Sequence, residues 1–208
     1  GADLSGIELR CLAHYLQDNG AYAKEILDGD IHSANAAAMG ISRSEAKVAV
    51  YCMIYGGGDK RLGEAVNGGA REGKALRDKF YRNNPAFKNL LLAVKRTVES
   101  KGYLTGLDGR KIVARSEHGQ LNVLLQSAAA LIAKKWVQLV DQKIREQGLD
   151  AEIITFCHDE IQIKVKGDAE YVGDNIALRS SKEAGEHFKI KIPIEAEYSV
   201  GQSWKDTH

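Results

Sequence analysis

Hydrophobic residues recur every three or four positions along most of the first part of the chain, which is the periodicity of amphipathic helices. This pattern predicts helices at 6–17, 21–28, 31–39, 43–54, 70–82, 85–100 and, as one long helix, 119–147. Three glycines at 56–58 end the fourth of these helices, and Pro85 lies near the start of the sixth. A turn-rich stretch centred on Asp108-Gly109 predicts a short hairpin.

The hydrophobic pattern changes in the last part of the chain. Short runs rich in β-branched residues predict strands at 152–157 and 160–166, and a final strand near 191–198. A helix is expected between them, at about 168–187. Helices followed by a small antiparallel sheet make the expected fold class α+β.

Composition narrows the possible functions. The chain has 208 residues, enough for one large domain or two small ones, and its net charge is +1. No global basic field therefore marks a nucleic-acid-binding protein, and any such surface must be local. The apolar runs are shorter than a membrane span and no signal peptide opens the chain, so we expect no membrane partner. Three cysteines (Cys11, Cys52 and Cys157) are expected to be reduced core residues of a cytoplasmic protein.

Adjacent acids interrupt the two predicted strands in the stretch FCHDEIQIKV. The sequence predicts a tight hairpin turn that holds Asp159 and Glu160, directly after His158. Acids are common in turns, where they are usually solvated. A second carboxylate from elsewhere would change this interpretation, since gathered acids bind hard cations such as Mg²⁺. Asp3 is a candidate, although an acid that caps the following helix would look the same.

A row of cations and aromatics follows the helix predicted at 43–54. Arg43, Lys47, Tyr51 and Tyr55 recur every four residues, so they drift by only about 40° per step and share one face over roughly 18 Å. Cations lie at the N-terminal end, where the helix dipole favours anions, and aromatics lie at the other end. This order suits a ligand with a polyphosphate at one end and a flat base at the other. A solvated basic patch beside two half-buried tyrosines is the alternative.

Three parts of the chain resemble the ordered motifs of family A DNA polymerases, the group of bacterial DNA polymerase I and short-tailed phage replicases. They are the segment that begins at Asp3, the row from Arg43 to Tyr55, and the acids after His158. The family's motif A, Asp-x-Ser-x-x-Glu-Leu-Arg, is matched by Asp3, Ser5, Glu8, Leu9 and Arg10. Its motif B, Arg-x3-Lys-x3-Phe/Tyr-x3-Tyr-Gly, is matched by Arg43, Lys47, Tyr51, Tyr55 and Gly56. Its motif C is matched by His158, Asp159 and Glu160. The stretches GDIH, GLDGRK and LNVLLQSAAAL also resemble the phage branch.

The resemblance implies a DNA-directed DNA polymerase that uses two Mg²⁺ ions. Asp3 and Asp159 would hold the ions together with the backbone carbonyl of Leu4, and Glu160 would lie near the primer end. Arg43, Lys47 and His32 would bind the triphosphate of the incoming dNTP. Lys47 would also protonate the leaving pyrophosphate as a general acid.

The remaining motif residues are assigned by the same resemblance. Tyr51 would pack against the sugar and base of the dNTP, and Tyr55 would stack where the templating base enters. Glu8 would hydrogen-bond Tyr55 and exclude a ribose 2′-hydroxyl. Contacts with primer–template DNA are expected from Tyr55, Gly56, His118, Asn122, Gln126 and His158. For the stripe formed by His118, Asn122 and Gln126, ordinary surface polarity of a helix is the alternative.

The resemblance also predicts the domain organisation. Residues 1–15 and 122–208 would form an incomplete palm with a small antiparallel sheet, and 16–121 an inserted helical fingers subdomain. Thumb and exonuclease regions are expected to be absent, so the missing N-terminal portion, on the same or a separate polypeptide, would be a partner. Two other functions stay open: an inert folded fragment that at most binds nucleotide or nucleic acid, and a two-carboxylate metal nuclease.

Overall fold

The computed structural model describes residues 1–208 and divides the chain into two compact units. The first unit combines Gly1–His14 with Ser127–His208, and the second is the continuous segment Tyr15–Gln126. Helices dominate, and the strands form only small antiparallel sheets, so the α+β prediction is confirmed. The two ends of the chain thus belong to one unit, which the second unit interrupts.

A four-stranded sheet organises the first unit. Its strands are β1 (Ala2–Leu4), β4 (Ala151–Cys157), β5 (Glu160–Val165) and β6 (Ala196–Tyr198), in the order β4-β5-β1-β6. All neighbouring strands are antiparallel, and β1 lies between β5 and β6. The start of the chain is therefore held between two strands from near its end.

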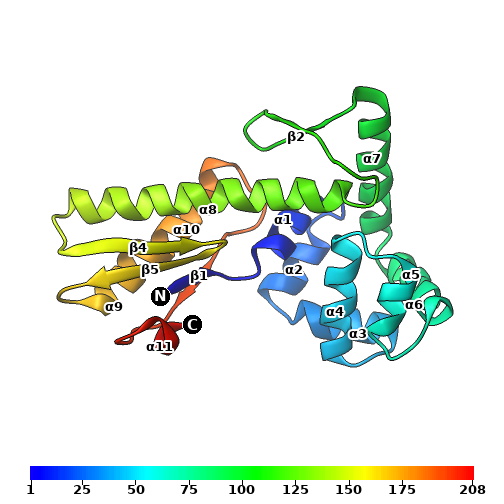
Figure 1. The fold of residues 1–208 in the computed structure, drawn as a ribbon, viewed down its shortest axis with the longest axis horizontal. Helices are drawn as coiled ribbons and strands as arrows, with labels where there is room; N and C mark the ends of the chain where they lie inside the picture. The colour runs from blue at the N-terminus through cyan, green and yellow to red at the C-terminus, as the bar shows by residue number, and fades with distance from the viewer. The chain divides into compact units, whose positions relative to one another are not determined.

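Helices cover this sheet. Helix α1 (Ile7–Tyr15) follows β1, and the long helix α8 (Gln120–Glu146) runs along the strands β4 and β5 (Figure 1). The region expected to be one helix at 168–187 consists of α9 (Ala169–Tyr171), a π-helix η1 (Val172–Ala177) and α10 (Leu178–His187). Trp136 of α8 is fully buried and donates its indole N–H to the Ala177 carbonyl at 2.8 Å. This bond fixes α8 against the end of the π-helix.

Helix α8 is also long and apolar enough to cross a membrane by length and composition, in contrast to the expectation from the sequence. The core helix of a soluble protein meets the same criterion. Leu125, Ile132 and Val140 are all fully buried along α8, which is how a core helix satisfies its apolar face.

The second unit is a set of helices with one small hairpin. Its elements are α2 (Ala21–Leu27), α3 (Ile31–Met39), α4 (Arg43–Ile54), α5 (Asp59–Glu64), α6 (Ala70–Asn83), α7 (Pro85–Lys101), β2 (Leu104–Thr105) and β3 (Lys111–Ile112). Ser42 and Glu45 form a capping box that starts α4, as their spacing indicates. Phe80 and Phe87 are buried and meet edge to face at 5.1 Å between α6 and α7.

Several elements differ from the sequence-based expectation. The short helices α5 and α11 (Trp204–Thr207) were not predicted, because each is too short to show a hydrophobic period. The last strand covers only Ala196–Tyr198, although the Glu195 carbonyl before it still accepts a hydrogen bond from the Ser5 amide at 2.9 Å. Cys157 is exposed at the end of β4, so it is not a core residue, whereas Cys11 is buried and all three cysteines are free.

Candidate active site

The interrupting acids lie at the tip of the β4–β5 hairpin. Cys157 pairs with Glu160, which leaves His158 and Asp159 as a two-residue turn. Glu160 is therefore the first residue of β5, and the prediction that placed it in the turn is corrected. His158 has the left-handed value φ 56°, which is uncommon for a residue other than glycine. The turn fixes the backbone on both sides of Asp159.

The pairing of β1 with β5 brings the two predicted metal-binding aspartates into one region. Asp3 lies directly opposite Glu160 in the strand register. Next to this pair, the Leu4 amide donates a hydrogen bond to the Asp159 carbonyl at 3.0 Å. Burial, followed by the charges of Asp159, Glu160 and Glu197, raises the pKa of Asp3 to about 6. Burial likewise raises the pKa of Asp159, and the charge of Glu8 adds to this effect.

Three acids form a row across three adjacent strands. Asp3 lies opposite Glu160 of β5 on one side and opposite Glu197 of β6 on the other. Directly opposed residues of antiparallel strands point to the same face, so like charges here are destabilising. The Ser5 hydroxyl donates to Glu197 at 3.3 Å. Sequence analysis missed Glu197, because only the register of β6 on β1 reveals it.

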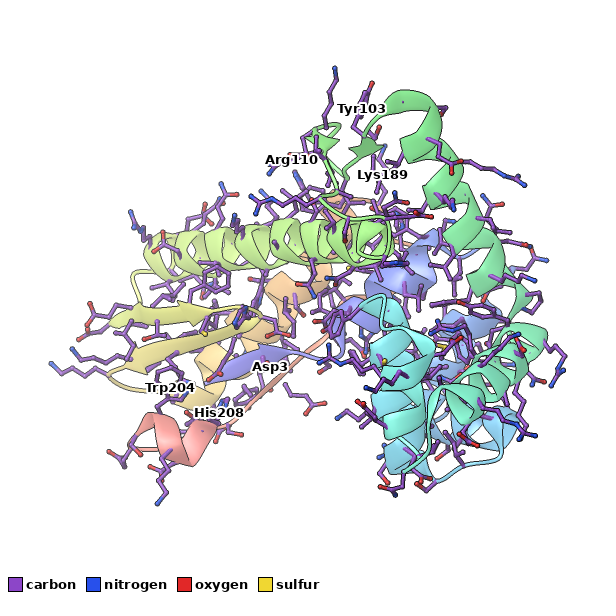
Figure 2. All side chains as sticks on the ribbon, turned by 45° about the vertical axis from the view of Figure 1, so that its right-hand side comes forward. Asp3, Tyr103, Arg110, Lys189, Trp204 and His208 are labelled. Atoms are coloured by element: carbon purple, nitrogen blue, oxygen red, sulfur yellow. The ribbon has the colours of Figure 1, made fainter.

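Glu160 differs from its neighbours because its carboxylate has several partners. Its Oε1 accepts hydrogen bonds from Gln162 Nε2 at 2.5 Å and from the Trp204 indole at 2.8 Å, and its Oε2 lies 2.8 Å from His208 Nδ1. Burial alone would raise the pKa of Glu160, but these hydrogen bonds hold the pKa below its usual value. Trp204 of α11 and the following His208 thus cover the Glu160 carboxylate; both residues are labelled in Figure 2. No pattern in the sequence predicts these contacts.

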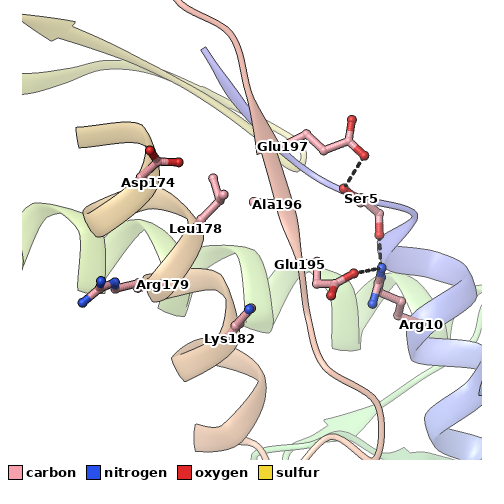
Figure 3. A pocket seen from close by; sticks show the side chains of 9 residues that line it. All are labelled: Ser5, Arg10, Asp174, Leu178, Arg179, Lys182, Glu195, Ala196 and Glu197. Carbon is pink, nitrogen blue, oxygen red and sulfur yellow. Dashed lines mark hydrogen bonds and ion pairs between the residues drawn. The ribbon is translucent and has the colours of Figure 1, made fainter. Parts of the chain in front are cut away.

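The buried Arg10 side chain holds the segment that follows Asp3 in place. Its side chain is only 6% exposed, and it donates to the Ser5 carbonyl at 2.8 Å, the Pro193 carbonyl at 2.5 Å and Glu195 Oε2 at 2.7 Å. These bonds tie the start of α1 to the segment that leads into β6 (Figure 3). A buried arginine with every edge engaged is a structural support for Asp3 rather than a group available to a ligand.

The donors around Asp3 fit a hard divalent cation. The predicted set consists of the Asp3 and Asp159 carboxylates and the Leu4 carbonyl, which are oxygen ligands of the kind Mg²⁺ prefers. The chain contains no ready-made group of three or more His, Cys, Asp and Glu side chains arranged to hold a metal. Burial is the main cause of the raised pKa of Asp3; the charges of Asp159, Glu160 and Glu197 add to it, and a bound cation would offset these charges.

The second unit carries the row of cations and aromatics on α4. Arg43 is the first residue of this helix, and Tyr55 is its C-terminal cap, 46% exposed. The rings of Tyr51 and Tyr55 lie 6.0 Å apart, and the His32 ring lies 6.4 Å from Tyr51. The structure therefore joins His32 of α3 to the row that the helical spacing predicted.

The pKa of His32 is lowered in this surrounding, which favours the neutral imidazole. Burial is the main cause of its lowered pKa, and the positive charges of Arg43 and Lys47 lower it further. Asp30, the N-cap of α3, forms an ion pair with Arg43 at 2.6 Å. Sequence analysis did not assign Asp30, although its place in the GDIH stretch, two positions before His32, was visible.

A pocket of about 420 Å³ lies along the outer flank of this row. It is lined by Lys47, Val48, Tyr51, Cys52, Tyr55, Gly57 and Arg61. Val48 and Cys52 are four residues apart on α4, so the helical spacing could have identified them, whereas Arg61 comes from the unpredicted helix α5. The two tyrosines thus border a pocket that two cations, Lys47 and Arg61, also line.

Two residues expected to contact DNA touch each other within the second unit. Gly56 has φ +75°, and a Cβ added to it would lie 1.9 Å from the His118 carbonyl oxygen. His118 lies in the turn before α8, so the expectation that it begins the helical stripe is corrected; Asn122 and Gln126 are on α8 itself. Close to Gly56, the Arg77 side chain donates to Asp59 and to the Gly57 carbonyl, each at 2.7 Å.

The comparisons with known proteins agree on one family. The family model described as DNA polymerase family A matches residues 1–206. The DNA-directed DNA polymerases of Enterobacteria phage T3 and Escherichia phage T7 are 39% and 37% identical to this chain, over 100% of its length and 33% of theirs. DNA polymerase I of Pseudomonas aeruginosa is 28% identical over 100% of this chain and 25% of its own length.

One solved structure supports the fold in particular. The polymerase domain of Pol1 from M. smegmatis, in complex with DNA primer-template and dNTP, has a TM-score of 0.87 at 24% identity. The match covers 99% of this chain and 39% of that one. The chain thus spans about a third of the length of the phage relatives and shares its whole fold with part of a longer protein.

Proposed function

Because the chain belongs to DNA polymerase family A, we propose that it carries the metal-binding and nucleotide-selecting part of a DNA-directed DNA polymerase. In that reaction the 3′-oxygen of a primer forms a bond to the α-phosphorus of a dNTP, and the bond to pyrophosphate breaks. The observation that carries the proposal is the pairing of β1 with β5, which brings Asp3 into the region of the Asp159 turn.

Asp3, Asp159 and the Leu4 carbonyl would hold the divalent cations. When bound, Mg²⁺ would lower the pKa of the primer 3′-hydroxyl and neutralise charge on the triphosphate. Two local structures hold the backbone near the metal-binding aspartates. The hairpin turn fixes the backbone of Asp159, and the Arg10 bonds fix the segment after Asp3. Glu160, engaged by Trp204 and His208, would lie near the primer end instead of binding metal.

The N-terminal end of α4 would bind the triphosphate. Arg43 and Lys47 supply positive charge there, and the neutral His32 supplies a hydrogen-bonding ring nitrogen. Lys47 would also deliver a proton to the leaving pyrophosphate oxygen. At the other end of the row, Tyr51 would contact the sugar and base, and Tyr55 the templating base, with the pocket beside them as the space for a flat ring.

Primer–template DNA would be the second substrate. Gly56, His118, Asn122, Gln126 and His158 are the proposed contacts. Gly56 and His118 support this because their close packing leaves no side chain between the end of α4 and the turn before α8. Glu8, on α1, keeps its predicted role in excluding a ribose 2′-hydroxyl.

Single-nucleotide incorporation tests the proposal. The purified chain alone should extend a primer–template weakly or not at all, because it spans only about a third of the length of the phage relatives. Supplied with the missing N-terminal portion as a second polypeptide, it should add the complementary dNTP in the presence of Mg²⁺, and removing the cation with EDTA should stop it. Asp3→Asn and Asp159→Asn should abolish incorporation, and Lys47→Gln should slow it by about 10²-fold through the lost proton donor. Lys24→Gln, which removes the same charge from α2, should leave the rate unchanged.

The outcomes separate the three functions. Binding of dNTP without any incorporation, even with the N-terminal portion added and bound, would favour the inert-fragment alternative. Shortening of the primer that needs Asp3 and Asp159 but is indifferent to Lys47→Gln would indicate a metal nuclease. Incorporation that ignores the template base or survives Asp159→Asn would contradict the polymerase assignment.

A further inference from the structure

Asp30 joins the two helices that carry the proposed triphosphate ligands. It is the N-cap of α3, where its Oδ1 accepts from the His32 amide at 3.0 Å and its Oδ2 accepts from the Ser33 hydroxyl at 2.8 Å. The same carboxylate accepts from Arg43 Nε at 2.6 Å and from Arg43 Nη2 at 3.4 Å. One side chain thus sets both the start of α3, with His32, and the side chain of the first residue of α4.

The contact uses only one edge of the Arg43 guanidinium. Nε and Nη2 face Asp30, which leaves Nη1 and the second proton of Nη2 to donate elsewhere. That second edge has the fork geometry that binds phosphate oxygens in pairs. The Arg43 side chain is 60% exposed, so its free edge is open to solvent and to a ligand.

Stability is a weak explanation for this ion pair. Both side chains are substantially exposed, and exposed pairs contribute little to folding because solvent screens them and ordering two side chains costs entropy. Asp30 would satisfy the helix start without Arg43, since its cap bonds to His32 and Ser33 suffice. The cap bonds do not explain why the Arg43 guanidinium is held in one direction.

We propose that Asp30 is a positioning residue for the triphosphate site, holding Arg43 by one edge so that the other edge meets the phosphates. The inference rests on the proposed function and assigns a role to a residue outside the three motifs. The opposite role would be a competitor, in which the Asp30 charge repels the triphosphate and occupies Arg43. The two roles predict opposite signs when the charge is removed, so binding measurements can separate them.

Asp30→Asn is the informative variant, because asparagine caps helices as well as aspartate does. Calorimetric titration with inorganic tripolyphosphate, and separately with a dNTP, should show roughly three- to tenfold weaker binding for both ligands, as one charge-assisted contact is loosened. Asp28→Asn is the matched control. It removes the same charge two positions away, from a residue whose side chain forms no hydrogen bond, and should bind as tightly as the parent chain or slightly more tightly.

A double-mutant cycle tests the route through Arg43. In the Arg43→Gln background, adding Asp30→Asn should cause no further loss of tripolyphosphate affinity. Thermal melting of each variant checks that the chain remains folded, and a purely structural role for Asp30 would give the same loss in both backgrounds.

Three results would overturn the inference while leaving the proposed function standing. These are equal or tighter tripolyphosphate binding by Asp30→Asn, a loss confined to the dNTP, and a loss that persists without Arg43. If the parent chain bound neither ligand, the proposed triphosphate site itself would fail, and the role of Asp30 would fail with it.

Discussion

At the scale of single residues, the row of Asp3, Glu160 and Glu197 places like charges side by side on adjacent strands. Asp3 faces an acid on each side, and its pKa is raised to about 6 by burial and by those neighbours. Like charges held together in this way are destabilising without a counter-ion, and strain of this kind is typical of sites that bind a ligand. Folding thus tolerates Asp3 at a cost in stability.

Asp3→Asn should therefore stabilise the chain in the absence of divalent ions. A raised carboxyl pKa means that the native state binds more protons between pH 4 and 6, so stability falls as pH rises through this window and is constant above it. The variant should gain about 1 kcal/mol above pH 6, a value discounted because Asp3 is partly exposed, and nothing below pH 4. Denaturant unfolding at several pH values measures this.

Two comparisons complete this test. Glu186→Gln, which removes an exposed acid of α10, should show no such pH-dependent gain. Adding Mg²⁺ should raise the melting temperature of the parent chain more than that of Asp3→Asn, because ligand binding to the native state stabilises it. A destabilised Asp3→Asn at pH 7 without metal would contradict the interpretation of the acidic row.

Gly56 tests the junction between motif B and the turn before α8. Alanine there would need a left-handed backbone, and its Cβ would overlap the His118 carbonyl, so Gly56→Ala should lose about 2–4 kcal/mol. Gly109 has φ +81° but no atom within 4 Å of an added Cβ, so Gly109→Ala should lose only about 1 kcal/mol. Urea unfolding of the two variants compares them; equal losses would mean that contact with His118 is unimportant.

At the scale of elements, the very short helix α11 makes contacts that its length does not suggest. Helix α11 has only four residues, yet it supplies the Trp204 bond to Glu160, and the following His208 supplies another. So short a helix has no independent stability, and its caps and tertiary bonds hold it in place. Glu160 and α11 therefore stabilise each other.

A double-mutant cycle on α11 examines this dependence. Trp204→Phe and His208→Ala should each lower stability by about 1 kcal/mol, since each removes a hydrogen bond to a carboxylate. The combined loss should differ from the sum, because both bonds share Glu160. Lys205→Ala, on an exposed residue of the same helix, should change stability by less than about 0.5 kcal/mol. If the first two variants behaved like Lys205→Ala, the hydrogen bonds to Glu160 would not support α11.

At the scale of the whole molecule, charge limits how DNA can be bound. The net charge is +1, from 29 basic and 28 acidic residues, so attraction to phosphates depends on local groups. Several of the cations are already paired, including Arg77 with Asp59 and Lys164 with Glu152. Attraction to a duplex thus depends on where the remaining cations lie on the surface, because the net charge supplies almost none.

Primer–template DNA should consequently bind this chain weakly. At physiological salt the dissociation constant should be in the range of about 10⁻⁴ to 10⁻⁶ M that is typical of non-specific contacts, with a shallow dependence on salt concentration. Fluorescence anisotropy of labelled primer–template over a salt series measures both quantities. Nanomolar binding at physiological salt would show that local surfaces supply far more affinity than the net charge suggests.

The sequence by itself determined the elements whose signals are local. The bounds of α3 and α4, at 31–39 and 43–54, agree with the prediction because capping residues and helical spacing act within a few positions of each other. The same spacing produced the row from Arg43 to Tyr55, since residues four apart share a helix face whatever surrounds them. Motif A and motif C were recognisable as short stretches, without knowledge of their pairing.

Only the tertiary structure decided which distant groups meet. Glu197 joins Asp3 through strand register, Trp204 and His208 reach Glu160 from the C-terminal end, and Asp30 reaches Arg43 across a helix junction. None of these contacts has a local signature, because a strand slipped by one residue would turn every side chain to the other face while the sequence stayed the same. The chemistry-bearing residues are thus readable along the chain, but the charge and hydrogen bonds around each depend on how the sheet and helices pack.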